Sequence, residues 1–172
     1  MALLTSYRHL TTEQLILRPL ELTDAPAIFQ YTSDPHVARF THWDAHTNLD
    51  ETIRYIQRIK QLTSTQVWGI ALQNSKTLIG ECSITCHENG TAELYYALAY
   101  PHWGNGYTTQ ALTTLLNVIE EVNTIDHLEA WIIKENIASC RVAEKVGLQL
   151  THVIDQAWIL DKSAHDIAVY SK

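Results

Sequence analysis

Residues 93–112 read ELYYALAYPHWGNGYTTQAL, and this stretch decides the fold. A strand-like run over 92–100 leads into Gly104 and Gly106, and the apolar spacing beyond them predicts a long helix that begins near Gly106. Glycines let the backbone approach a ligand closely, and the free N–H groups of a first helical turn favour phosphate. The turn therefore has the outline of an anion site, with a purely structural turn as the alternative. A dinucleotide fingerprint is disfavoured because its third glycine falls on Thr109.

The segments on either side of this stretch predict the rest of the sheet. Runs over 67–72, 78–86 and 92–100 are separated by turn compositions, which indicates an antiparallel meander. The long helix is followed by a strand over 128–133, and this strand–helix–strand order implies parallel neighbours. The other predicted elements are a strand at 14–20, helices at 23–31 (capped by Thr23), from 33, at 49–62 and at 136–147, and a closing hairpin of 149–159 with 167–170. The fold class is α+β, a mixed, mostly antiparallel sheet with helices on both faces.

Composition limits the classes of protein to which this chain can belong. A length of 172 residues with 46% hydrophobic and 18% charged residues predicts a single domain over 1–172. A formal net charge of −7 argues against nucleic acid as the main partner. The absence of a signal-like start and of a long apolar run argues against export and membrane insertion, and three cysteines do not form a secreted disulfide framework, so we expect a cytoplasmic protein.

The histidines and cysteines predict no metal site. The nine histidines include no HExxH pattern or other metal-ligand spacing. Cys82 and Cys86 share one strand face about 13 Å apart, which is too far for a disulfide or a shared metal. They are expected to act as small apolar core residues.

The stretch 93–112 resembles the acetyl-CoA segment of the GNAT superfamily of N-acetyltransferases. The similarity is greatest to the branch that acetylates the N-terminal amines of ribosomal proteins, the RimJ/RimL-like enzymes. Residues 15–20 and 33–35 near the start, and 136–139 and 144–148 near the end, fit the same branch in the same order. Departures occur at Pro101, Gln110 and Leu148, where the superfamily or branch usually has Gln or Arg, Glu and an aromatic residue. They bear on subfamily and acceptor more than on cofactor, since backbone N–H groups hold pyrophosphate.

The resemblance implies that acetyl-CoA is the co-substrate and assigns residues to it. In this family the strand before the glycine turn presents backbone groups to the pantetheine arm and the acetyl carbonyl, and such donors stabilise a developing oxyanion. The residues that match cofactor positions are Leu98, Tyr100, Trp103, Gly104, Asn105, Gly106, Tyr107, Thr108, Thr109, Asn136 and Ser139.

Two side chains are candidates for acid–base chemistry. Glu93, on the strand before the glycine turn, is the predicted general base acting through water, and a solvated strand residue is its alternative role. Ser139 is the predicted acid for the leaving thiolate, because Ala143 stands where the superfamily often has a tyrosine. The resemblance assigns the pantetheine arm to Asn136; its alternative role is to cap a helix, and that of Ser139 is to solvate the first turn of this helix.

The acceptor is predicted to be a primary amine, most specifically the α-amine of a peptide or protein. The resemblance places Tyr31, His42, Trp43 and Asp44 beside it, and core packing is the alternative role for Trp43. Alternative acceptors are a polyamine, an amino acid or an aminoglycoside, and an alternative class is a non-catalytic acyl-CoA-binding or interaction module. Both a monomer and a homodimer are compatible with the sequence.

Overall fold

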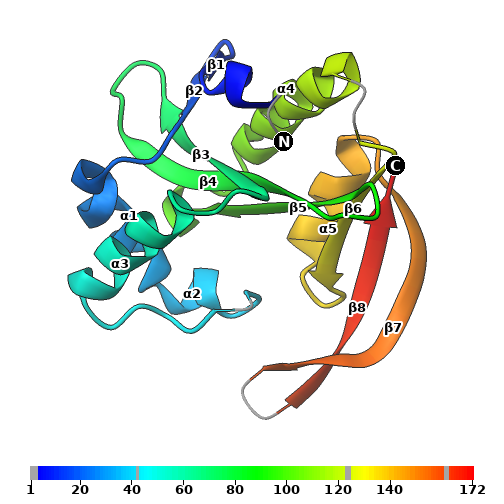
Figure 1. The fold of residues 1–172 in the computed structure, drawn as a ribbon. Coiled ribbons are helices and arrows are strands. Elements are labelled where there is room, and N and C mark those ends of the chain that lie inside the picture. Colours follow the sequence, from blue (N-terminus) through cyan, green and yellow to red (C-terminus); the bar gives the residue numbers. More distant parts are fainter. Residues whose placement is uncertain (1–3, 42, 123–124, 161–162) are drawn as a thin grey trace.

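An eight-stranded sheet organises the chain in the computed structural model, which describes residues 4–41, 43–122, 125–160 and 163–172 (Figure 1). The strand order is β1-β2-β3-β4-β5-β6-β8-β7. The strands are β1 Leu10–Thr11, β2 Leu15–Arg18, β3 Thr65–Leu72, β4 Leu78–Cys86, β5 Thr91–Leu98, β6 His127–Ile133, β7 Gln149–Leu160 and β8 Ser163–Ser171. The α-helices are α1 Ala25–Thr32, α2 Pro35–Ala38, α3 Leu49–Ile59, α4 Tyr107–Val122 and α5 Ile137–Lys145.

The sheet opens in its middle, between β5 and β6. The pairing of these two strands is parallel, whereas the other strand pairs within the described residues are antiparallel, as the sequence predicts. It joins Thr91, Ala92 and Glu93 to His127, Leu128 and Glu129, and both strands then continue without pairing to each other. The two strands therefore part toward their carboxyl ends, where α4 and α5 begin.

Helices cover both faces of the sheet, which confirms the predicted α+β class. Helices α4 and α5 contribute Leu112, Leu115 and Ala143, all fully buried, to a core against one face. Helices α1 and α3 contribute Ile28 and Ile56 to a second core on the other face. Full burial of each such leucine or isoleucine stabilises the fold by roughly 1.5–3 kcal/mol. Across the described residues, no helix is both long and apolar enough to span a membrane.

The strand predicted at 14–20 is shorter, Leu15–Arg18, and the one predicted at 167–170 is longer, Ser163–Ser171. Other predicted boundaries are also wrong. Strand β5 ends at Leu98 rather than at 100, because Pro101 has no N–H and the 3₁₀ turn Tyr100–His102 replaces the strand. Helix α3 ends at Ile59 rather than at 62. Thr23 lies inside the 3₁₀ turn Leu22–Asp24 instead of capping α1. The Asp24 carboxylate accepts from Arg18 at 2.8 Å and from the Glu21 N–H at 2.8 Å, and these hydrogen bonds fix how the chain enters α1.

Gly80 sets how closely β4 approaches the end of β5, so Gly80→Ala is expected to destabilise the fold. An added Cβ would lie 2.3 Å from the Ala97 carbonyl oxygen and 2.9 Å from Leu98 Cα, both backbone atoms. We expect a loss of about 1–3 kcal/mol in unfolding free energy, measured by urea titration. Gly69→Ala is the matched control, because its Cβ meets only the ends of two flexible leucine side chains. Equal losses in the two variants would contradict the backbone clash.

Candidate functional site

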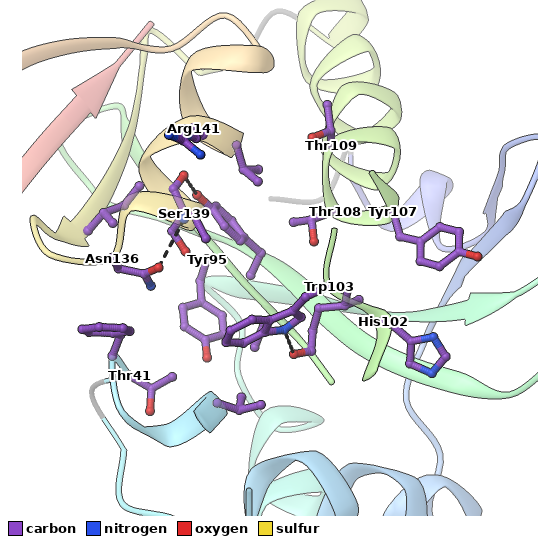
Figure 2. Close-up of a pocket in the computed structure, with 18 of the residues that line it drawn as sticks. Thr41, Tyr95, His102, Trp103, Tyr107, Thr108, Thr109, Asn136, Ser139 and Arg141 are labelled. Atoms are coloured by element: carbon purple, nitrogen blue, oxygen red, sulfur yellow. Dashed lines mark hydrogen bonds between the residues drawn. The ribbon is translucent and has the colours of Figure 1, made fainter. Parts of the chain in front are cut away.

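A cleft of about 330 Å³ lies where β5 and β6 part. Figure 2 shows Thr108 and Thr109 at the start of α4 on one side of it, and Asn136, Ser139 and Arg141 at the start of α5 on the other. The carboxyl-terminal half of β5 forms its floor. The split in the sheet thus places two helix N-termini beside one strand.

The glycine turn leaves its backbone open to this cleft. Gly104 and Gly106 both have φ of +78°, a conformation that L side chains rarely adopt, and a Cβ added to either would meet no atom within 4 Å. The Trp103 indole N–H donates to the Leu98 carbonyl at 2.6 Å and holds the turn against β5. The backbone ladder of α4 begins with Gln110 N donating to Gly106 O at 3.0 Å, so the N–H groups of residues 107–109 remain outside it. Such a cradle suits a phosphate.

The α5 side of the cleft contains a helix cap and two positively charged side chains. The Asn136 side-chain oxygen accepts from Ser139 N at 3.2 Å, which confirms that Asn136 begins the helix, and the Tyr96 hydroxyl donates to Ser139 O at 2.9 Å. Arg141 and Lys145 line the cleft one helical turn apart, and both are exposed. The sequence analysis missed these two residues, although their i, i+4 spacing next to a predicted anion site was a usable signal.

Most residues assigned to the cofactor line this cleft. They are Leu98, Trp103, Gly104, Gly106, Tyr107, Thr108, Thr109, Asn136 and Ser139. Tyr100 lies outside the lining and stacks on His36, with ring centroids 4.4 Å apart. Asn105 also lies outside it and donates to the His102 and Trp103 carbonyls at 3.1 Å, so it braces the turn. Gln110, one of the departures, accepts from the Thr12 hydroxyl at 2.6 Å.

A second cavity, of about 700 Å³, lies against the opposite face of the sheet, beneath α3. Strand register places Glu81 opposite Ala97, Ser83 opposite Tyr95 and Thr85 opposite Glu93, so these alternate side chains share that face. Tyr95 lines both the cleft and this cavity. The two spaces therefore meet at the strand that separates them.

A buried carboxylate forms part of the cavity wall. Glu81 is 4% exposed, and its Oε1 accepts from the Tyr55 hydroxyl at 2.6 Å. Its Oε2 and the Tyr31 hydroxyl are both buried without a hydrogen bond to any other described residue, and the two groups interact with each other. Burial raises the pKa of Glu81, against the hydroxyls of Tyr55 and Tyr31, which lower it. The sequence analysis missed this residue because a single glutamate within a strand carries no signal of its burial.

The residues predicted for acid–base chemistry and for acceptor binding lie in different parts of the structure. Glu93 lines the second cavity, with a side chain 48% exposed and 3.9 Å from the His87 ring nitrogen. Trp43 lines it too and donates to the Tyr95 hydroxyl at 2.9 Å. Tyr31 is buried behind Glu81, and Asp44 is exposed and lines neither space. His42 lies outside the described residues.

The cysteines are free, and burial raises the pKa of the Cys82 and Cys140 thiols. Cys82 packs in the core, as expected, and Cys86 is half-buried. A search for three or more His, Cys, Asp or Glu side chains arranged to hold a metal finds none in the part of the chain that the structure describes.

Comparison with known proteins gives one family. Residues 14–149 match the model of the acetyltransferase (GNAT) domain. The N-acetyltransferase p20 of Bacillus licheniformis is 30% identical over 145 residues, 81% of this chain and 82% of that protein. The N-acetyltransferase YoaA of Bacillus subtilis is 28% identical over 167 residues, 94% of each chain.

Solved structures share the fold. RimL, a ribosomal L7/L12 α-N-protein acetyltransferase solved with coenzyme A, superimposes with a TM-score of 0.84 at 23% identity and 94% coverage of each chain. The microcin C7 self-immunity acetyltransferase MccE, solved with acetyl-CoA and AMP, gives 0.85 at 22% identity, covering 94% of this chain and 93% of MccE.

Proposed function

The chain belongs to the GNAT family of acetyltransferases, and we propose that it transfers the acetyl group of acetyl-CoA to the α-amine of a peptide or protein. One observation carries the proposal: an anion cradle and a cavity with carboxylates meet at Tyr95, on opposite faces of β5. A thioester and an amine entering from opposite faces would meet there. Holding two reactants together in this way lowers the activation barrier by several kcal/mol.

The cleft fits acetyl-CoA in its chemistry. The open backbone at Gly104 and Gly106 and the N–H groups of residues 107–109 would hold the pyrophosphate, and Arg141 and Lys145 add positive charge. The edge of β5 that no longer pairs with β6 would hydrogen-bond the pantetheine arm and the acetyl carbonyl. We infer a cytoplasmic location from the free thiols, which suit a reducing compartment.

The reaction needs a neutral amine and a protonated leaving group. The amine nitrogen attacks the thioester carbonyl, the N–C bond forms, the C–S bond breaks, and the nitrogen loses one proton while the sulfur gains one. Glu93, at the cavity, accepts the proton of the amine through water, and Ser139, at the cleft, donates to the sulfur. This assignment gives each side chain a role on the face of β5 where it lies.

The acceptor proposal predicts a preference for a chain end over a lysine side chain. At pH 7 about a tenth of an α-amine with a pKa near 8 is neutral, against a few parts in ten thousand for a lysine near 10.4. We therefore expect a peptide with a free N-terminus and a blocked lysine to be acetylated faster than the same peptide with the blocks exchanged, as measured by mass spectrometry in competition. Faster acetylation of the lysine, or of spermidine, would contradict the acceptor and leave the cofactor chemistry standing.

A further inference from the structure

The cleft crosses the sheet at the split between β5 and β6. Leu94 of β5 and Ile132 of β6 pack in the core against α4 and α5. Tyr95 and Trp131 are their neighbours along the two strands, so their side chains lie on the opposite face. All four residues line the cleft. The cleft therefore extends from the phosphate cradle through the sheet to the face on which Glu93 lies.

The part of the cleft on this second face is apolar and aromatic. Val37 of α2 and Phe40, which follows that helix, line the cleft together with Trp131 and Ile133 of β6. Phe40 packs against the small core cluster that contains Ile133. Phe40 is half-buried, and Trp131 is 46% exposed. Rings that line a cleft and still face solvent offer area that an apolar group of a ligand can cover.

A hydrogen bond holds the Trp131 indole in place. Its N–H donates to Glu129 Oε2 at 2.9 Å, and Glu129 lies two residues earlier on the same face of β6. Glu129 lines neither the cleft nor the second cavity. It therefore acts through Trp131: it orients the ring before a ligand arrives, which reduces the side-chain entropy lost on binding.

The proposed general base lies beside this surface. Strand register pairs Glu93 of β5 with Glu129 of β6, and Trp131 follows on the same face. An amine that gives its proton to Glu93 through water at the end of this pairing would have its nearest substituent next to the Trp131 ring. In a peptide acceptor, this substituent is the side chain of the first residue.

The charges around the cleft favour an uncharged substituent. Among the described residues the cleft lining contains no carboxylate, and its guanidinium and ammonium groups, those of Arg141 and Lys145, belong to α5. The Arg39 guanidinium lies over the Phe40 ring, with Cζ 5.0 Å from the ring centroid. A cationic side chain beside Phe40 would be repelled by Arg39, and an acidic one would lose hydration against two rings.

Resting on the proposed function, we propose that the acceptor peptide begins with a large apolar residue, whose side chain lies on Trp131 and Phe40, and that Glu129 is the positioning residue for Trp131. A first residue without a side chain leaves both rings uncovered. The surface thus selects among α-amines by the apolar area that the first residue buries.

Four peptides that differ only in their first residue test the inference with the intact protein and acetyl-CoA. The first residue is leucine, glycine, arginine or glutamate, and none of the peptides contains lysine. Each presents an α-amine, so the ratio of rates reports the side chain rather than the proton acceptor. We expect kcat/KM for the leucine peptide to be about tenfold higher than for the glycine peptide, and higher than for the two charged ones.

Variants locate the preference. Trp131→Ala should bring the leucine-to-glycine ratio close to one. Leu150→Ala is the matched control, because Leu150 is 52% exposed on β7 and lines neither space, and it should keep the ratio. A rise in Tm with acetyl-CoA verifies that each variant is folded.

Two variants test how Glu129 acts. Glu129→Ala should lower the ratio about threefold, because the indole is then no longer held. Glu129→Gln should restore it, since an amide oxygen also accepts from the indole N–H. A Glu129→Gln enzyme that behaves like Glu129→Ala would show that the charge matters instead, which contradicts a positioning role.

Three results overturn the apolar preference and leave α-amine acetylation standing: equal kcat/KM for the leucine and glycine peptides, a preference for arginine or glutamate, or a leucine preference that survives in Trp131→Ala. If acetyl-CoA raises Tm but none of the four peptides is acetylated, the proposed function fails, and this inference fails with it.

Discussion

Gly104→Val and Gly106→Val are each expected to abolish the stabilisation that acetyl-CoA should give to the wild type. Both glycines sit at φ of +78° with open space where a Cβ would point, so a valine there strains the turn and fills the cradle. For the wild type, acetyl-CoA at a hundredfold its Kd contributes about 2.7 kcal/mol. For a chain of this size that corresponds to a rise in Tm of roughly 5–11 °C, which thermal unfolding measures directly.

Gly147→Val is the matched control for this experiment. Gly147 ends α5 at φ of +91°, where a Cβ would meet only the end of the Lys172 side chain at 4.0 Å, and it lines neither space. The variant carries comparable backbone strain and should melt earlier without ligand, but it should keep the rise with acetyl-CoA. A full rise in the two turn variants would show that the cofactor does not use this backbone.

Glu93→Gln is expected to lower kcat about 100-fold at pH 7 and to leave the acetyl-CoA effect on Tm unchanged. The carboxylate lies on the acceptor side of β5 and outside the cleft, so its loss removes a proton acceptor without touching the cofactor cradle. The deficit should shrink as the pH rises through about 8, since the α-amine is then already neutral. Steady-state rates from pH 6 to about 9.5 measure this.

Glu88→Gln is the control, because Glu88 is exposed in the turn between β4 and β5 and lines neither space. It should leave kcat unchanged. A Glu93→Gln enzyme with the wild-type rate at every pH would return Glu93 to the role of a solvated strand residue, paired weakly with His87.

The fold could be predicted from the sequence where local chemistry and hydrophobic periodicity agree. The meander, the helix after the glycine turn and the helix that starts at Asn136 are each specified by a few neighbouring residues, and the structure confirms them. Two of the wrong boundaries arose where a side-chain contact or a proline prevailed: Arg18 binds Asp24, and Pro101 ends the strand before Tyr100.

The cofactor side of the site was more predictable than the acceptor side. Its residues form one contiguous motif, and most of them line the cleft. The second cavity is lined by β3, β4, β5, α3 and residues before α3. Its contacts join residues far apart in sequence: Glu81 contacts Tyr55 across 26 residues, and Trp43 contacts Tyr95 across 52. No local pattern carries such contacts, so the burial of Glu81 became visible only in three dimensions.

The most direct test of the central claim is to incubate the wild-type chain with acetyl-CoA and a peptide that has one free N-terminus and no lysine, and to quantify released CoA and acetylated peptide together. We expect the two products to appear in equal amounts and the acetyl group to map to the N-terminal nitrogen. Binding of acetyl-CoA without acetylated product from this peptide or from any small amine would contradict the account.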